Sequence, residues 1–110
     1  MFKNHHSFIT AGKGGKMLSD IPKKLEKVGK KDISNEILRA GMIAELDAVS
    51  LYEQMAVMTD DKAIKKVLLD IAKEEKTHMA EFEALLLNRD KEQKKEIEEG
   101  KKEVRKLAGE

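Results

Sequence analysis

Three residues of this sequence carry side chains that could bind a metal ion together: Glu45, Glu75 and His78. Glu75 and His78 form a Glu-x-x-His motif, and side chains three positions apart in a helix share one face. Carboxylate oxygens combined with an imidazole suit iron or manganese, and zinc also accepts such ligands. The motif alone arises by chance in many charged helices, so its meaning depends on the elements that hold it.

Two stretches of the chain have apolar residues spaced alternately four and three apart, which is typical of the inward seam of packed helices. The first seam consists of Leu38, Met42, Glu45, Val49, Tyr52 and Ala56. The second consists of Ile64, Leu68, Ile71, Glu75, His78, Phe82 and Leu85. A carboxylate on such a seam must be protonated, paired or bound to a metal, because an isolated buried charge is costly. Neither seam offers a Lys or Arg to pair with it.

The sequence predicts an all-α fold whose main part is an antiparallel hairpin of two helices. The first helix is expected to begin at an N-cap residue, Asp32 or Ser34, and to run to about Met58. Residues 59–61 then form a turn whose aspartates favour the start of the next helix. The second helix is expected to end at about Leu87.

A short, charged third helix follows a predicted break at residues 88–90. It starts at Lys91, is expected to be interrupted at Gly100, and ends near Leu107. No stretch alternates β-branched with polar residues for more than a few positions, so no strand is predicted. The domain prediction is therefore a basic leader over residues 1–31 and one helical domain over residues 32–110.

The position of the turn gives an independent check on the three candidate ligands. Glu45 lies fifteen residues before Asp60 and Glu75 lies fifteen residues after it. With a helical rise of about 1.5 Å per residue, both glutamates would stand roughly 22 Å from the turn, at one height of the hairpin. Three ligands are thus predicted to converge on one level.

One Glu and one Glu-x-x-His make up half of a di-iron carboxylate site. The complete site takes a Glu from each of two helices and a Glu-x-x-His from each of two others. The chain has no second Glu-x-x-His on an apolar stripe. We therefore expect two copies of the chain to dimerise into a ferritin-like four-helix bundle that holds two iron ions.

Composition supports a thin domain that needs a partner. The 110 residues are 39% charged, 40% hydrophobic and only 4% aromatic, and a hairpin of this size buries little apolar surface alone. The absence of cysteine excludes disulfides, zinc fingers, iron–sulfur clusters and rubredoxin-type iron centres. No apolar run reaches the roughly 18 residues of a membrane span, and no signal-peptide core is present, so we expect a cytoplasmic protein.

Charge is distributed unevenly along the chain. Residues 1–31 contain eight Lys against Asp20 and Glu26, for a net charge of +6, whereas residues 32–110 carry −5. Aromatic residues are not interleaved among these lysines, as they would be in many nucleic-acid-binding segments, apart from Phe2 and Phe8. The segment could contact an acidic partner, but we interpret it as a solvated, flexible leader and expect neither nucleic acid nor a membrane as partner.

The sequence resembles the encapsulated ferritin-like proteins, short relatives of ferritin housed inside encapsulin nanocompartments. The resemblance lies in IAELDAVSLYEQM at residues 43–55, in LLDIAKEEKTHMAEFEALL at residues 68–86 and in the charged helix after Asn88. It covers roughly residues 33–108. It implies that Glu45, Glu75 and His78 are ferroxidase ligands, mirrored across a dimer interface, and that dimers assemble into a ring, typically a decamer.

The resemblance also implies roles for residues near the metal site. Tyr52 matches a tyrosine close to the metal in the family, and Glu74 is either a supporting neighbour of the site or a solvated side chain. Some members bind metal at an outer site through two further glutamates of the first helix. Ala44 and Asp47 stand at those positions here, so one of the two carboxylates is missing.

The function implied is oxidation of Fe(II) to Fe(III) by O2, which feeds iron to an encapsulin compartment. Members reach the shell through a C-terminal targeting peptide or as a fusion to the shell protein. The chain ends in KKEVRKLAGE, without such a peptide, so one expectation is that it is the N-terminal segment of a fusion. Two alternatives are peroxide scavenging of the rubrerythrin kind, disfavoured by the lack of cysteine, and a non-enzymatic helical oligomerisation module.

Overall fold

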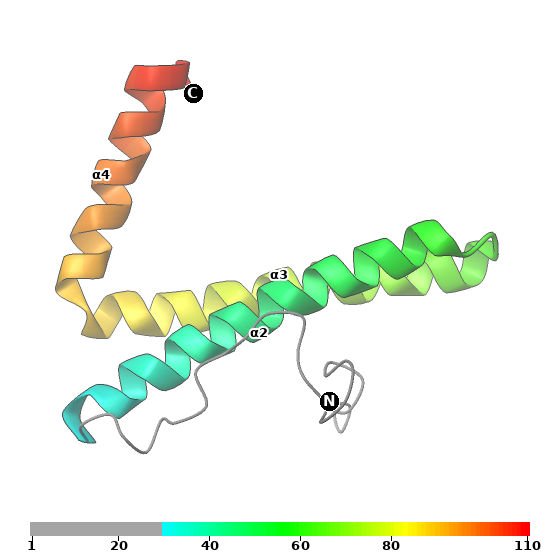
Figure 1. Ribbon diagram of the computed structural model, residues 1–110, viewed down its shortest axis with the longest axis horizontal. Coiled ribbons are helices and arrows are strands. Elements are labelled where there is room, and N and C mark those ends of the chain that lie inside the picture. Colours follow the sequence, from blue (N-terminus) through cyan, green and yellow to red (C-terminus); the bar gives the residue numbers. More distant parts are fainter. Residues whose placement is uncertain (1–29) are drawn as a thin grey trace.

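The structure, a computed structural model, describes residues 30–110, which form three α-helices and no strand. Helices α2 (Lys30–Met58) and α3 (Lys62–Arg89) pack against each other as an antiparallel hairpin. Helix α4 (Lys91–Ala108) leaves the open end of the hairpin at a steep angle (Figure 1). The all-α fold, with a two-helix hairpin and a shorter C-terminal helix, is therefore confirmed. The predicted basic leader lies largely outside the described residues.

The turn of the hairpin is fixed by polar side chains over residues 59–61, as predicted. Asp61 is the N-cap of α3, and its Oδ1 accepts hydrogen bonds from the backbone N–H groups of Ala63 and Ile64 at 2.9 and 3.0 Å. Thr59 Oγ1 accepts from the backbone N–H of Asp61 at 3.1 Å. Lys65 of α3 reaches back and donates to the backbone carbonyl of Ala56, which satisfies one of the free carbonyls at the end of α2.

Asp90 forms the corner between α3 and α4. Its backbone N–H donates to the carbonyl of Leu86 at 2.8 Å, which ends α3, and its Oδ1 accepts from the N–H of Gln93 at 2.9 Å, which begins α4. Its other oxygen, Oδ2, accepts a hydrogen bond of 2.8 Å from Arg39 Nη2 of α2. Arg39 also pairs with Glu36. One aspartate therefore caps both helices and ties their junction to α2.

Three boundary predictions were wrong. Helix α2 begins at Lys30, so Asp32 stands inside the first turn, where its charge suits the helix dipole, and neither Asp32 nor Ser34 is the N-cap. Helix α3 continues to Arg89, and only Asp90 of the predicted break is non-helical. Helix α4 is continuous through Gly100, because a glycine weakens a helix without removing its hydrogen bonds. It ends at Gly109, a left-handed residue with φ of 75°.

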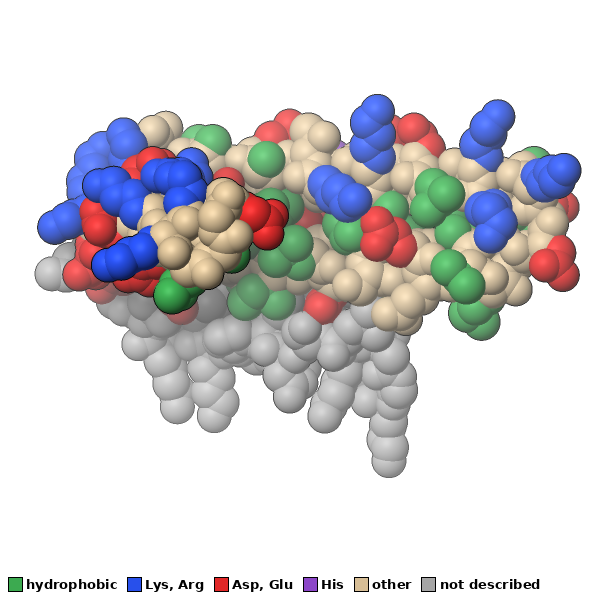
Figure 2. All heavy atoms as spheres, turned by 90° about the horizontal axis from the view of Figure 1, so that it is seen from above, with side chains coloured by type: hydrophobic (Ala, Val, Ile, Leu, Met, Phe, Trp, Pro, Cys, Tyr) green, Lys and Arg blue, Asp and Glu red, His purple; other side chains and the backbone are tan. Residues whose placement is uncertain are grey.

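The core of the hairpin is narrow. The least exposed residues are Ala48, Ala56 and Ala72, at 1%, 2% and 1%, and no large side chain among residues 32–110 is completely buried. Large apolar side chains instead remain on the surface, where Figure 2 shows hydrophobic groups between the lysines that project from the hairpin. Exposed apolar area of this kind in a small domain indicates contact with another molecule.

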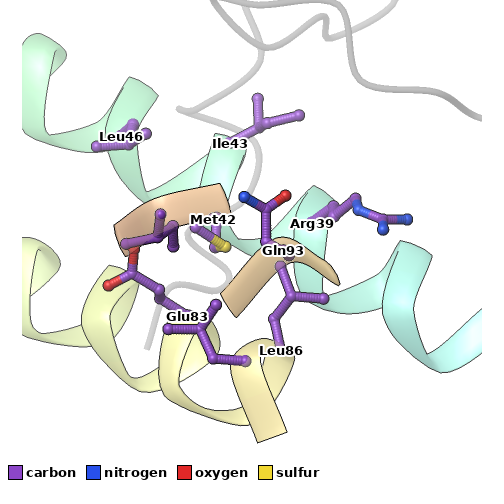
Figure 3. Close-up of a pocket in the computed structure, with 9 residues that line it drawn as sticks. Arg39, Met42, Ile43, Leu46, Glu83, Leu86 and Gln93 are labelled. Atoms are coloured by element: carbon purple, nitrogen blue, oxygen red, sulfur yellow. The ribbon is translucent and has the colours of Figure 1, made fainter. Parts of the chain in front are cut away.

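A hollow of about 480 Å³ lies at the corner where the three helices meet (Figure 3). Its lining is mainly apolar and comprises Arg39, Met42, Ile43, Leu46, Glu83, Leu86, Leu87, Gln93 and Ile97. Helix α4 contributes only two of these residues and has no buried residue of its own. Its position in the single chain thus depends mostly on the Asp90 corner.

Candidate metal centre

Glu45, Glu75 and His78 meet halfway along the hairpin. One ligand atom of each lies within 4.8 Å of the others, as expected for groups that could hold one metal ion. Glu45 comes from α2, whereas Glu75 and His78 come from successive turns of α3. The convergence at one height follows from the equal distances of the two glutamates from the turn, as the sequence predicts.

The contacts among the three side chains are unequal. His78 Nδ1 lies 2.9 Å from Glu75 Oε1, which is hydrogen-bond distance within one helix face. The same nitrogen lies 3.8 Å from Glu45 Oε1 on the other helix. Helix periodicity fixes the first separation, whereas the second depends on how closely α2 packs against α3.

The solvent exposure of the three side chains increases from Glu75 through Glu45 to His78. Glu75 is 4% exposed, the Glu45 side chain 16% and the His78 side chain 50%. The carboxylates therefore lie inside the hairpin while the imidazole lies at its surface. A site with one buried wall and one open side can receive further ligands only from the side of His78.

The electrostatics of the two carboxylates favour a cation. Burial, a hydrogen bond with Glu75 and the charges of Glu75 and Glu81 raise the pKa of Glu45 to about 8. Within residues 32–110 no Lys or Arg forms an ion pair with Glu45 or Glu75. Without metal, Glu45 holds a proton that it donates to Glu75, and a divalent ion could replace that proton. The donor set therefore fits iron.

The other predicted residues lie outside this cluster. Tyr52 is half-buried, and burial together with the negative charge of Glu75 raises its pKa, so its hydroxyl lies in the field of the site. Asp47 is also half-buried, but it is two residues from Glu45 and does not belong to the group that could hold a metal. Glu74 is exposed beside Glu75 and does not join the group either.

Glu81 contributes to the electrostatics of the site although it is not a member of either predicted seam. Its charge helps to raise the pKa of Glu45, although it belongs to the other helix. It stands three residues after His78, and the i, i+3 spacing that linked Glu75 to His78 could have found it as well.

None of the helices from residue 30 onward is long and apolar enough to cross a bilayer.

Comparison with known proteins places these features in a family. The sequence profile of the EncFtn-like family matches residues 20–102. The ferritin-like–encapsulin shell fusion protein of Pyrococcus furiosus is 57% identical over 74 residues, which make up 67% of this chain and 21% of that protein. The chain thus spans about a fifth of the length of this curated relative.

The solved structures give the same result for the fold. The crystal structure of the encapsulated ferritin domain from Pyrococcus furiosus is similar with a TM-score of 0.69 and 45% sequence identity. The match covers 91% of this chain and 96% of that one. The helices, the Glu-x-x-His motif and both comparisons agree, and the chain belongs to the EncFtn-like family of encapsulated ferritin-like proteins.

Proposed function

We propose that this protein is a ferroxidase, which oxidises Fe(II) to Fe(III) with O2 at a di-iron site shared between two copies of the chain. The observation that carries the proposal is the convergence of Glu45, Glu75 and His78 within 4.8 Å, with no Lys or Arg ion pair to the two carboxylates within residues 32–110. Family membership supports iron as the metal.

The need for a second copy follows from the ligand count. Two irons in a carboxylate bundle take four carboxylates and two imidazoles, and one chain supplies half of them. A second hairpin, related by a two-fold axis beside His78, would supply the other half. The result is the four-helix bundle that the sequence analysis predicts.

The surface around His78 supports this docking. Ile64, Ile71, His78 and Leu85 follow one another at seven-residue steps along α3, so they lie on the same side of the helix. Ile64 and Leu85 are 51% and 55% exposed. Ile37 of α2 is 50% exposed and borders the same small hollow as Leu85. Ile37, Ile64 and Leu85 belong to an apolar strip that also contains the half-exposed His78. A strip of this kind is suited to a self-complementary two-fold contact.

The chain's own residues divide the work of the site. Glu75, the most buried carboxylate, would bridge the two irons together with its mate, Glu45 would bind one iron terminally, and His78 would bind it through a ring nitrogen. Each pair of Fe(II) ions gives two electrons to O2, which takes up two protons and leaves as hydrogen peroxide. The protein holds both iron ions within reach of one O2 and keeps the carboxylates from water on the Glu75 side.

The product would pass to an encapsulin compartment. The relative from Pyrococcus furiosus carries a ferritin-like part joined to an encapsulin shell protein, and this chain matches about a fifth of its length. We extend the association to this chain, with dimers joined into a ring, a decamer in this proposal, inside the shell. The uncovered apolar residues of α4, Val104 at 52% exposure and Leu107 at 87%, support contacts beyond the dimer.

The test is Fe(II) oxidation in air-saturated buffer, followed by the near-ultraviolet absorbance of Fe(III). Wild type is expected to exceed the buffer rate, and Glu45→Ala, Glu75→Ala and His78→Ala are expected to fall to it. Glu53→Ala is the matched control, since Glu53 is an exposed carboxylate of the same helix as Glu45 that pairs with Lys76 at 3.2 Å. Equal rates for all five proteins with the assembly intact would contradict the proposal.

A further inference from the structure

Gly41 of α2 lies directly against the aromatic ring of Phe82 on α3. A Cβ atom added at Gly41 would stand 3.0 Å from Phe82 Cδ2 and Cε2 and 3.1 Å from Cδ1. Three ring atoms at nearly equal distances mean that the ring presents its face to the helix backbone. A methyl group at position 41 therefore fits only if the ring or the helix moves.

The backbone of α2 does not itself require a glycine at position 41. Gly109 is the only residue with positive φ among those described, so Gly41 has an ordinary helical conformation. A glycine inside a helix is less stable than an alanine at the same place. Gly100 inside α4 provides the contrast, because a Cβ there would meet nothing within 4 Å. What distinguishes Gly41 is the ring of Phe82.

This contact lies one helical turn from the metal cluster on both helices. Gly41 is four residues before Glu45, and Phe82 is four residues after His78, so each shares a helix face with a ligand. On the other side of the ligands, Ala48 and Ala72 are each only 1% exposed. Small residues thus keep α2 close to α3 on both sides of the site.

The spacing between the helices determines whether Glu45 joins the other two ligands. Glu75 and His78 remain together on α3 whatever α2 does. Glu45 reaches His78 Nδ1 only at 3.8 Å, the longer of the two separations, and it does so from the opposite helix. A shift of a few tenths of an ångström at the next turn acts directly on that distance.

We propose that Gly41 is a positioning residue for the metal centre, which acts by letting the ring of Phe82 lie against α2. The absence of a side chain at position 41 sets the helix separation at which Glu45 completes the three-ligand cluster. The inference rests on the proposed function for its metal and on the Gly41–Phe82 contact for its geometry.

The test compares wild type, Gly41→Ala and Gly41→Ala/Phe82→Leu in two measurements. The first is titration with Co²⁺, a spectroscopic substitute for Fe(II), whose visible absorption bands report the ligand set. Gly41→Ala is expected to bind Co²⁺ about tenfold or more weakly, in line with losses from displaced supporting residues, and with an altered spectrum. The double variant, with a smaller side chain facing the new methyl group, is expected to regain the wild-type spectrum.

Gly100→Ala is the matched control, because it makes the same change in a helix interior where nothing lies within 4 Å. It is expected to leave the Co²⁺ spectrum unchanged. A helix-propensity effect alone would act on both glycine variants alike, so the comparison separates positioning from propensity.

The second measurement is the crystal structure of the metal-free protein. Gly41→Ala is expected to lengthen the Glu45–His78 separation beyond 3.8 Å, whether or not the wild type binds Co²⁺. If the wild type shows no Co²⁺ bands, the proposed function fails while this distance still decides the role of Gly41. An unchanged distance and an unchanged spectrum in Gly41→Ala would overturn the inference.

A final comparison covers the case in which Gly41→Ala does not fold. Phe82→Leu and Gly41→Ala/Phe82→Leu are then compared with each other, and we expect equal Co²⁺ spectra because the steric conflict is gone. Loss of the bands only in the double variant would also overturn the inference.

Discussion

The hairpin and α4 use their side chains in opposite ways. The hairpin keeps the carboxylates of its polar cluster inside, with Glu75 only 4% exposed, and all of the buried residues of the described chain belong to α2 and α3. Helix α4 has no buried residue, although Ile97, Val104 and Leu107 follow one face at helical spacing. The difference teaches that one chain brings the three side chains of the cluster together by itself, whereas the apolar face of α4 stays uncovered in the single chain.

The largest effect is expected at Glu75, inside the hairpin. If Glu75 is a direct ligand, as proposed, its replacement should weaken Co²⁺ binding by about 100-fold or more, since even supporting neighbours of metal ligands cost about 10–100-fold. Glu75→Gln preserves shape and should leave the metal-free protein folded, because the amide oxygen can still accept the hydrogen bond from the protonated Glu45. Calorimetric titration measures the affinity. Glu96→Gln in α4 is the control. Comparable losses of Co²⁺ affinity in both variants would contradict the claim that the hairpin, and not α4, binds the metal.

The hairpin should also show a pH dependence that α4 lacks. The pKa of Glu45 is raised from 4.5 to about 8 by burial and by Glu75, so the folded state holds this proton more tightly than the unfolded state. Stability from this group is complete below pH 4.5 and is lost as pH rises toward about 8. Urea denaturation of metal-free protein should show this decline in wild type and a flatter profile in Glu45→Gln. A profile unchanged by the substitution would contradict the burial of Glu45.

The sequence predicted the site because periodicity and one turn determine it. The four-three seams identify the inward faces, and the turn ending at Asp61 places Glu45 and Glu75 at equal height. Ile64 and Leu85 were assigned to the same inward seam, yet both are half-exposed in the single chain. A seam pattern indicates that these side chains are buried, but it does not say whether the same chain or a second copy buries them.

Other features depend on contacts between residues far apart in the chain. Arg39 binds Asp90 across 51 positions, and no local pattern links those two side chains. The fit of Phe82 against Gly41 likewise appears only when the two helices are packed. From the sequence alone, a glycine in a helix indicates only a less stable helix. The same interpretation of a glycine as a point of weakness led to the wrong expectation of a break at Gly100.

The corner should have a moderate effect that leaves the metal cluster intact. Asp90→Ala removes an N-cap and the partner of Arg39, and it is expected to lower stability by about 1 kcal/mol. Asp90→Asn can still cap α4 and should lose less. Chemical denaturation measures the stability, and size-exclusion chromatography measures the assembly. Impaired Co²⁺ binding in an otherwise intact Asp90→Ala dimer would show that corner and site are coupled.

The smallest expected effect is at the turn end of the hairpin. Lys65 donates to the carbonyl of Ala56, and Lys65→Met should cost roughly 0.5–1 kcal/mol by leaving that carbonyl to water. Lys66→Met changes an exposed neighbour and serves as control. Thermal unfolding of both variants gives the comparison. Equal melting temperatures would mean that the turn side chains of Thr59 and Asp61 suffice to end α2.

The central claim is that one chain holds half of a di-iron site, and native mass spectrometry of anaerobically iron-loaded protein tests it most directly. The account predicts dimers, or rings of dimers, with two iron ions per pair of chains, and monomers without iron. His78→Ala should remove the iron from the dimers. A monomer that retains iron under these conditions would contradict the account.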